Sequence, residues 1–221
     1  MKTNLSVTEE NYIKTIYLLQ QVDENVTTNE VAATMNTKAA SVTDMLKKLK
    51  GKKILNYEKY RGFRLSTEGK KIALSIVRKH RLWEYFLVDK LQFGWDEIHE
   101  VAEEMEHITS KKLIDKLDAF LGYPKFDPHG DPIPDTNGRM IIQHQVNLSD
   151  LTPNTSAEIT MVGSQSTELL ELLKHKNITI GTRIEVKQKF SFDNSIEIKI
   201  KTQQPFIISQ QLAQVLFVKQ V

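Results

Sequence analysis

The sequence predicts a mainly helical protein with a small β domain: an N-terminal winged helix, a helical middle region and a C-terminal β-rich region of SH3-like size. Three observations support this fold class. Apolar residues recur at helical spacing through the first half of the chain, a helix-turn-helix pattern is followed by a hairpin pattern, and from about residue 140 the spacing changes to strict alternation. The 221 residues are enough for one or two domains, each with its own core.

The N-terminal region has the order of elements of a winged helix. The stretch LSVTEENYIKTIYLLQQV predicts a first helix, and Thr27 followed three residues later by Glu30 forms a capping box that begins a short second one. After a brief turn, AASVTDMLKKLKGK predicts an amphipathic third helix that ends at Gly51. The alternating ILNYEKYRGFRLS, with Arg61 and Gly62 at a turn, predicts a β-hairpin.

Three more helices and a β-rich region follow. The stretch STEGKKIALSIVRKHRLWEYFLVDKL predicts a long helix of about 25 residues, and IHEVAEEMEH and TSKKLIDKLDAFLGY predict two others. Residues 124–138 hold four of the six prolines and predict an extended linker. The strand patterns AEITMV, TRIEVKQKF, SIEIKIKT and QVLFVKQV surround one short helix, STELLELLKHK. We therefore expect domains at residues 1–70, 71–123 and 145–221, with a proline-rich linker at 124–144.

The composition restricts the kind of site that the chain can build. There is no cysteine, which excludes disulfides and thiolate ligands, so any metal must be held by imidazole and oxygen. No apolar run approaches the roughly 20 residues that a membrane span requires. We expect a cytoplasmic protein without a membrane partner.

Charge is strongly segregated along the chain. Residues 1–90 hold 17 basic and 10 acidic side chains, a balance of +7, whereas residues 91–135 hold 4 and 11, a balance of −7. A basic N-terminal region favours an anionic partner, and an acidic middle region favours a cationic one.

The predicted winged helix carries the residues expected to contact DNA. In such folds the N-terminal part of the second helix of the helix-turn-helix meets base edges, while nearby lysines and the wing contact phosphates. Two other interpretations remain: the lysines only solvate the helix, or the winged helix binds a protein. The residues expected at the DNA are Lys38, Ala39, Ala40, Ser41, Thr43, Asp44, Lys48, Lys59, Tyr60 and Arg61.

Two stretches carry side chains suited to a metal ion. On one helix, His99, Glu103, Glu106 and His107 would share a stripe about 100° wide. Carboxylates gathered in this way repel each other unless a cation lies among them. On the preceding helix, His80 and Glu84 are one turn apart and can donate two ligands to one ion. The alternative is a solvated acidic face with an ordinary histidine–glutamate ion pair.

The order of these motifs resembles the diphtheria-toxin-repressor family of metal-dependent repressors. The resemblance rests on the winged helix, RKHRLWE, IHEVAEEMEH, the proline-rich HGDPIP and the small β-rich region, and it covers nearly the whole chain. It implies a homodimer that binds palindromic operator DNA when loaded with Fe(II) or Mn(II) and represses genes for metal uptake. It also implies a helical domain for metal binding and dimerisation, and a C-terminal SH3-like β-barrel.

The resemblance implies two metal sites and an anion site. Arg81 matches the position that binds an anion beside the ancillary metal in the iron-sensing branch. The primary site would use Glu103, Glu106 and His107, with help from Asn11. The ancillary site would use His80, Glu84 and His99, with Gln165 and Glu168 added from the small domain.

Two departures from the family pattern affect the choice of metal. The iron-sensing branch has a cysteine where Glu103 stands, so this chain has a harder ligand set that favours Mn(II). The manganese-sensing branch has carboxylates at the positions of Asn11 and Lys14. Because a protonated lysine cannot ligate, Lys14 argues against the binuclear arrangement of that branch.

The sequence thus predicts a transcriptional regulator and not an enzyme, with Mn(II) or Fe(II) as cofactor. A winged-helix regulator that senses an organic ligand is the main alternative. A metal-dependent hydrolase is the other, but the cluster leaves no evident general base or nucleophile once its members serve as ligands.

Overall fold

The computed structural model describes residues 4–58, 61–201 and 203–221. The chain forms two compact units, each built from separate stretches of sequence. The first contains residues 1–80, 104–114 and 134–139, and the second contains residues 81–103, 115–133 and 140–221. In the described stretches, no helix combines the length and the apolar character needed to cross a bilayer.

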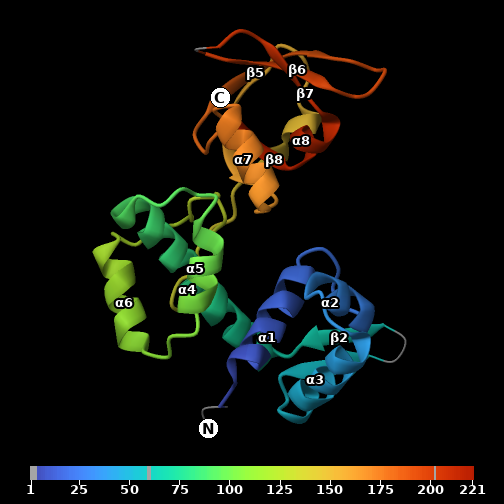
Figure 1. Cartoon of the computed structure of the whole chain (residues 1–221), viewed down its shortest axis with the longest axis vertical. Helices are drawn as coiled ribbons and strands as arrows, with labels where there is room; N and C mark the ends of the chain where they lie inside the picture. The colour runs from blue at the N-terminus through green and yellow to red at the C-terminus, as the bar shows by residue number, and fades with distance from the viewer. Residues whose placement is uncertain (1–3, 59–60, 202) are drawn as a thin grey trace. The chain divides into compact units, whose positions relative to one another are not determined.

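The first unit contains the predicted winged helix (Figure 1). Both of its first two helices begin with a capping box, formed by Ser6 with Glu9 and by Thr27 with Glu30. Its elements are α1 (Val7–Leu19), α2 (Thr28–Thr34), α3 (Ala39–Gly51), β1 (Leu55–Glu58) and β2 (Gly62–Leu65), and β1 and β2 pair antiparallel.

The buried carboxylate of Glu9 on α1 forms ion pairs with two lysines at the end of α3. Its carboxylate lies 3.2 Å from the Lys48 ammonium and 2.7 Å from that of Lys52, and it accepts the Ser6 backbone N–H. Burial alone would raise the pKa of Glu9, but these three partners lower it to about 2. The position of α3 on α1 therefore depends on an ionised carboxylate.

Helix α4 (Thr67–Leu91) has the 25 residues that its pattern predicts. Glycine is required at position 69, near the start of this helix, because a Cβ there would lie 2.3 Å from the Ile54 carbonyl oxygen. The next two helices, α5 (Ile98–Met105) and α6 (Lys111–Phe120), are also those predicted. However, α5 ends at Met105, so the prediction that Glu106 and His107 continue one helical stripe is wrong.

Residues 124–138 are not the extended linker that their prolines predict. Asp127 and His129 are buried, and Phe126 forms an isolated bridge with Pro132. The Asp127 carboxylate accepts the backbone N–H groups of His129 and Asp131, each at 2.9 Å. These bonds close a compact loop, because the aspartate side chain accepts from backbone N–H groups two and four residues further along the chain.

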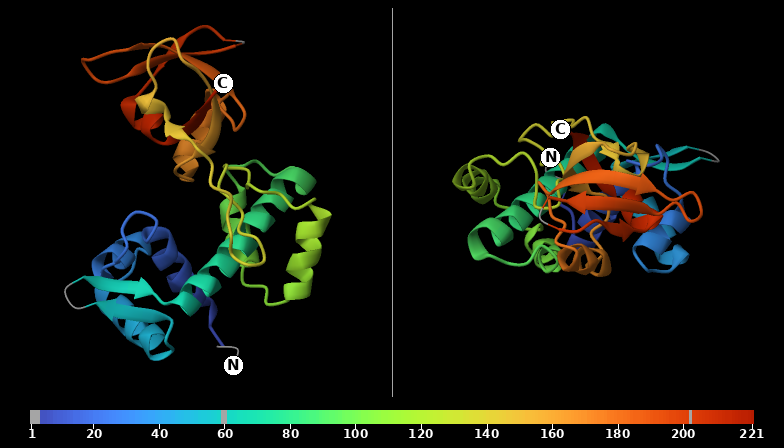
Figure 2. Two further views of the ribbon diagram at one scale, coloured as in Figure 1. Left: turned by 180° about the vertical axis from the view of Figure 1, so that it is seen from behind. Right: turned by 90° about the horizontal axis from the view of Figure 1, so that it is seen from above.

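The C-terminal part of the second unit is the predicted SH3-like domain. Its antiparallel sheet has the order β3-β8-β4-β5-β6-β7 and curves strongly, with α7 and α8 at one side (Figures 1 and 2). Alternate residues such as Ile196, Ile198 and Ile200 face one continuous core. The elements are β3 (Val146–Asn147), η1 (Leu148–Asp150), β4 (Ser156–Val162), α7 (Thr167–His175), β5 (Arg183–Lys189), β6 (Ile196–Ile200), β7 (Phe206–Ile208), α8 (Gln210–Gln214) and β8 (Leu216–Gln220).

Candidate metal centre and DNA-binding surface

The first turn of α3 is exposed to solvent. Its inner side is fixed by buried Val42, Leu46 and Leu49, which turns the opposite face toward solvent. Thr43 is half-buried, and its hydroxyl donates to the Ala39 carbonyl of the same helix at 2.9 Å. The other predicted base-contacting residues are exposed: Lys38, Ala39, Ala40, Ser41 and Asp44.

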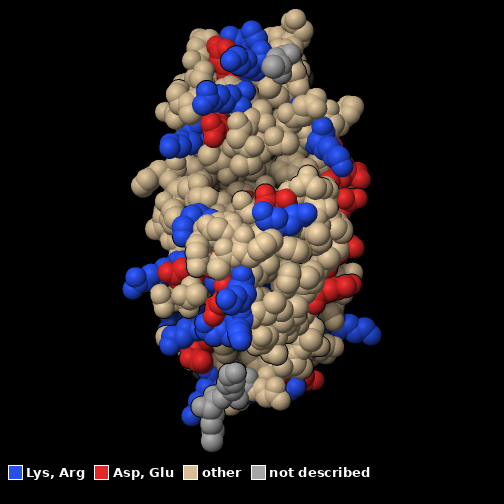
Figure 3. All heavy atoms as spheres, turned by 90° about the vertical axis from the view of Figure 1, so that its left-hand side faces the viewer, with Lys and Arg blue, Asp and Glu red and all other residues tan. Residues whose placement is uncertain are grey.

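The predicted phosphate-contacting residues differ in their surroundings. Arg61 is exposed at the turn of the hairpin, whereas Lys48 also pairs with Glu9. Lys59 and Tyr60 lie outside the described residues. On the face drawn in Figure 3, basic side chains are interspersed with acidic ones. The segregation of charge along the sequence therefore does not produce a continuous basic surface on that face.

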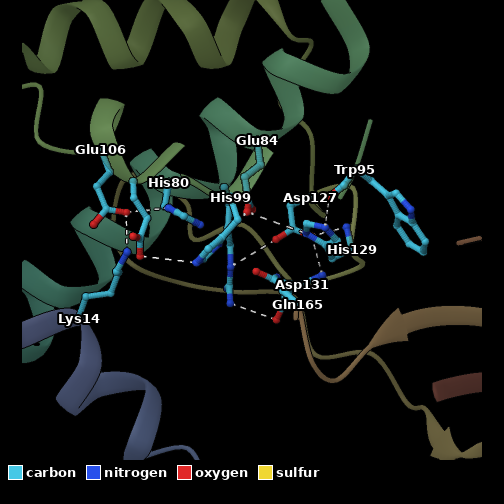
Figure 4. Close-up of polar contacts among 12 residues, drawn as sticks. Lys14, His80, Glu84, Trp95, His99, Glu106, Asp127, His129, Asp131 and Gln165 are labelled. Atoms are coloured by element: carbon cyan, nitrogen blue, oxygen red, sulfur yellow. Dashed lines mark hydrogen bonds and ion pairs between the residues drawn. The ribbon is translucent and has the colours of Figure 1, made fainter. Parts of the chain in front are cut away.

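Within the first unit, Glu106 is completely buried between two nitrogen groups (Figure 4). Its Oε2 lies 2.8 Å from the Lys14 Nζ and 2.7 Å from the His80 Nδ1. Burial raises the pKa of Glu106, but the hydrogen bond from His80 and the charge of Lys14 outweigh it, so the pKa lies below its ordinary value. Glu106 is therefore an ionised carboxylate away from water.

The other oxygen of Glu106, Oε1, lies nearer to His107. The His107 Nδ1 lies 2.6 Å from a Glu10 carboxylate oxygen, so it must donate, which leaves the lone pair of a neutral imidazole on Nε2. That Nε2 is 3.7 Å from Glu106 Oε1. Glu106 Oε1 and Asn11 Oδ1 are buried and have no hydrogen-bond partner among the described residues. Such atoms fit a cation, and Glu10 would orient His107 toward it.

The second unit holds another group of candidate ligands, which comes from two distant stretches of sequence. One ligand atom from each of Glu84, Asp127 and His129 lies within 4.8 Å of the others, and all three residues are buried. His99 Nδ1 is 3.5 Å from a Glu84 oxygen, and His99 Nε2 is 3.5 Å from Glu103 on the same helix. The side chain of Glu103 is half exposed. His80 precedes Glu84 by one turn of α4.

The chemistry of this group also fits a cation. Burial raises the pKa of Asp127 well above its usual range, and the charges of Asp131 and Glu84 raise it further, against a lowering effect of Arg81. Asp127 Oδ2 and His129 Nδ1 are buried without a hydrogen-bond partner among the described residues. A divalent cation would supply the missing positive charge and satisfy both atoms.

Three further predicted site residues are Arg81, Gln165 and Glu168. The Arg81 guanidinium, expected to bind an anion, lies 3.1 Å from Asp131 and 3.6 Å from Asp127, so the chain presents its own carboxylates there. The Gln165 amide donates to Asp131 at 3.1 Å, and Glu168 is exposed on α7.

Three of these residues, Glu10, Asp127 and His129, are not among the ligands that the sequence motifs predict. The available signal was HGDPIP and the aspartate two residues before its histidine, because a histidine and two aspartates among prolines are unusual in a mere spacer. Glu10 had no signal, because its partner is 97 positions away.

Family models match nearly the whole chain in three parts. Residues 4–63 match the N-terminal DNA-binding domain of iron-dependent repressors, and residues 66–135 match the metal-binding and dimerisation domain of the same proteins. Residues 146–220 match the FeoA domain.

Known proteins agree with these matches. The chain is 31% identical over 127 residues to the iron-dependent repressor IdeR of Mycobacterium leprae, which is 58% of this chain and 55% of that protein. The chain thus spans about half the length of the first such curated relatives. It is 36% identical over 118 residues to the regulator MntR of Oceanobacillus iheyensis, covering 53% of this chain and 80% of that one.

Solved structures match over more of the chain. A manganese-dependent transcriptional repressor in complex with manganese superposes with a TM-score of 0.87 at 27% identity, covering 96% of this chain and all of that one. The manganese regulator SloR superposes with a TM-score of 0.78 at 30% identity, covering 96% and 98%. The chain belongs to the iron-dependent repressor family, which also includes the diphtheria toxin repressor.

Proposed function

We propose that this protein is a metal-dependent transcriptional repressor that binds palindromic operator DNA as a homodimer and is activated by Mn(II) or Fe(II). The observation that carries the proposal is the buried group Glu84, Asp127 and His129, whose ligand atoms lie within 4.8 Å of one another in a chain with an exposed recognition helix. Repression of metal-uptake genes in the cytoplasm is the role that fits such a protein. Membership of a family of DNA-binding repressors argues against the hydrolase alternative.

The proposed ligand set has only nitrogen and oxygen donors. Glu84, Asp127 and His129 would hold one ion, with His99 beside Glu84 and His80 one turn earlier on α4. Asn11, Glu106 and His107 would hold a second, and Glu103 is the other ligand expected there. When bound, the ion supplies positive charge among buried carboxylates and so favours the arrangement of helices that binds the operator.

The proposed dimer is supported by apolar side chains left exposed in the second unit. Leu91 at the end of α4 is 52% exposed, and Phe120 at the end of α6 is 64% exposed. Phe93 and Tyr123 are exposed in the adjoining turns. Large apolar side chains at this density are typical of an interface, and they lie in the part that matches a dimerisation domain.

DNA binding measured with and without metal tests the proposal. Labelled genomic fragments upstream of metal-transport genes would be titrated with protein in the presence of Mn(II), Fe(II), Zn(II) or a chelator. We expect tight binding to a fragment only with metal. Asp127→Asn keeps the shape of the side chain and removes its charge, so the metal concentration needed for DNA binding should rise at least 10-fold.

Asp135→Asn is the matched control, because it makes the same change at an exposed position of the same loop. It should leave metal dependence unchanged. DNA binding that persists unchanged in chelator would contradict a metal-dependent repressor and support the regulator that senses an organic ligand.

A further inference from the structure

The SH3-like domain reaches the proposed metal centre through a line of polar contacts. Gln165 Nε2, in the turn before α7, donates to Asp131 Oδ2 at 3.1 Å (Figure 4). The other oxygen of Asp131 accepts from Arg81 Nη2 at 3.1 Å. Arg81 Nε lies 3.6 Å from Asp127 Oδ2, an atom suited to bind the cation. Gln165 thus connects to a candidate ligand through two intervening side chains.

Strand β4 holds the same loop by its backbone. The Val162 N–H donates to the His129 carbonyl at 3.0 Å. Gly130 has a φ of +91°, and a Cβ on it would lie 2.0 Å from the Thr160 carbonyl oxygen. Only glycine permits this approach of strand and loop. The position of His129 is therefore set by the SH3-like domain.

Trp95, in the turn between α4 and α5, fixes the ring of His129. Its carbonyl lies 2.9 Å from His129 Nε2, and because a carbonyl only accepts, Nε2 carries the proton. The unprotonated Nδ1 then faces Glu84, 3.9 Å away. The Trp95 ring stacks on His129 and packs against the core of the SH3-like domain. Ligating histidines are commonly oriented in this way.

We propose that Gln165 is a positioning residue of the metal centre: it holds Asp131, and through Arg81 it keeps Asp127 in place, so that the SH3-like domain sets the metal affinity without donating this side chain as a ligand. The resemblance to the family leads instead to an expectation that Gln165 ligates directly. In the structure the Gln165 amide nitrogen, which has no lone pair for a cation, donates to Asp131. The inference rests on the proposed metal centre at Asp127.

A double-mutant cycle separates positioning from ligation. Mn(II) affinity would be measured by isothermal titration calorimetry on the full chain with Gln165→Leu, Asp131→Ala and both changes. If Gln165 acts through Asp131, Gln165→Leu should weaken Mn(II) binding about 10-fold in the wild-type background and less than about 2-fold in the Asp131→Ala background. Gln188→Leu, at an exposed position of β5, is the matched control and should have no effect.

An equal loss in both backgrounds would show that Gln165 acts independently of Asp131, as a direct ligand would, and would overturn the inference. No loss in the wild-type background would also overturn it. Unfolding of the metal-free variants in urea should change little, which distinguishes a changed site from a changed fold. If Asp131→Ala does not fold, Arg81→Met provides the second background, because the same line of contacts passes through Arg81.

Failure of the proposed function gives a different result. In that case Asp127→Asn would leave Mn(II) affinity unchanged, whatever Gln165→Leu does.

Discussion

The Lys14 ammonium lies 2.8 Å from Glu106 Oε2, and both side chains are buried. Helix α1 of the DNA-binding region is thereby joined to the turn after α5 by an ion pair away from water. A buried carboxylate of this kind is stable only while it keeps its partners. The other oxygen of Glu106 stays available for a cation, so one carboxylate serves both the ion pair and the proposed second metal position.

Lys14→Met should destabilise the metal-free protein by about 3 kcal/mol, because it leaves the buried Glu106 charge without its ammonium partner. Urea unfolding in the presence of chelator measures this loss. Lys47→Met is the control: its partner Asp44 is 3.5 Å away and both are exposed, so little change is expected. A loss below about 1 kcal/mol for Lys14→Met would mean that water or another cation replaces the lysine.

Arg61→Ala should reduce the salt dependence of DNA binding by about one unit in the slope of log affinity against log salt, because each phosphate contact contributes about that much. Arg64→Ala tests the same change on a guanidinium that already pairs with Glu24 and Glu58. It should alter the slope less. Equal slopes for wild type and Arg61→Ala would place the turn of the hairpin off the DNA.

Glu9→Gln should lower stability at neutral pH, and the difference from wild type should shrink as the pH falls. The folded pKa of Glu9 is about 2, below the ordinary value of 4.5. The stabilisation is therefore fully present above pH 4.5 and is lost as the pH falls through 2. Unfolding free energies between pH 7 and pH 2 measure it, with Glu68→Gln, an exposed glutamate of α4, as control. A difference that is independent of pH would refute the ion-pair account.

Mn(II) should activate DNA binding at least as well as Fe(II), because oxygen and imidazole ligands accept Mn(II) and no thiolate is present to favour later metals. Glu103→Cys should shift the preference toward softer ions. Anaerobic titration of operator binding against free metal measures both effects. Activation of the wild type by Fe(II) but not by Mn(II) would place this chain with the iron sensors.

Several features depend only on residues close together in the sequence, and the sequence predicts them correctly. The capping box at Thr27 and Glu30, the 25-residue α4 and the alternation of β6 are of this kind. The pairing of His99 with Glu103 also follows from helical spacing. Short-range periodicity fixes these features, because neighbours three, four or two positions apart meet whatever the rest of the chain does.

Other features were decided by tertiary structure alone. Lys14 meets Glu106 across 92 positions of sequence, and no local pattern pairs them. Asp127 and His129 reach Glu84 because a proline-containing loop folds back on side-chain hydrogen bonds, where the sequence pattern predicts an extended linker. Glu106 is buried and Glu103 half exposed because α5 ends between them. Burial and charge at these positions depend on contacts distant in sequence, and those contacts turn candidate ligands into a site.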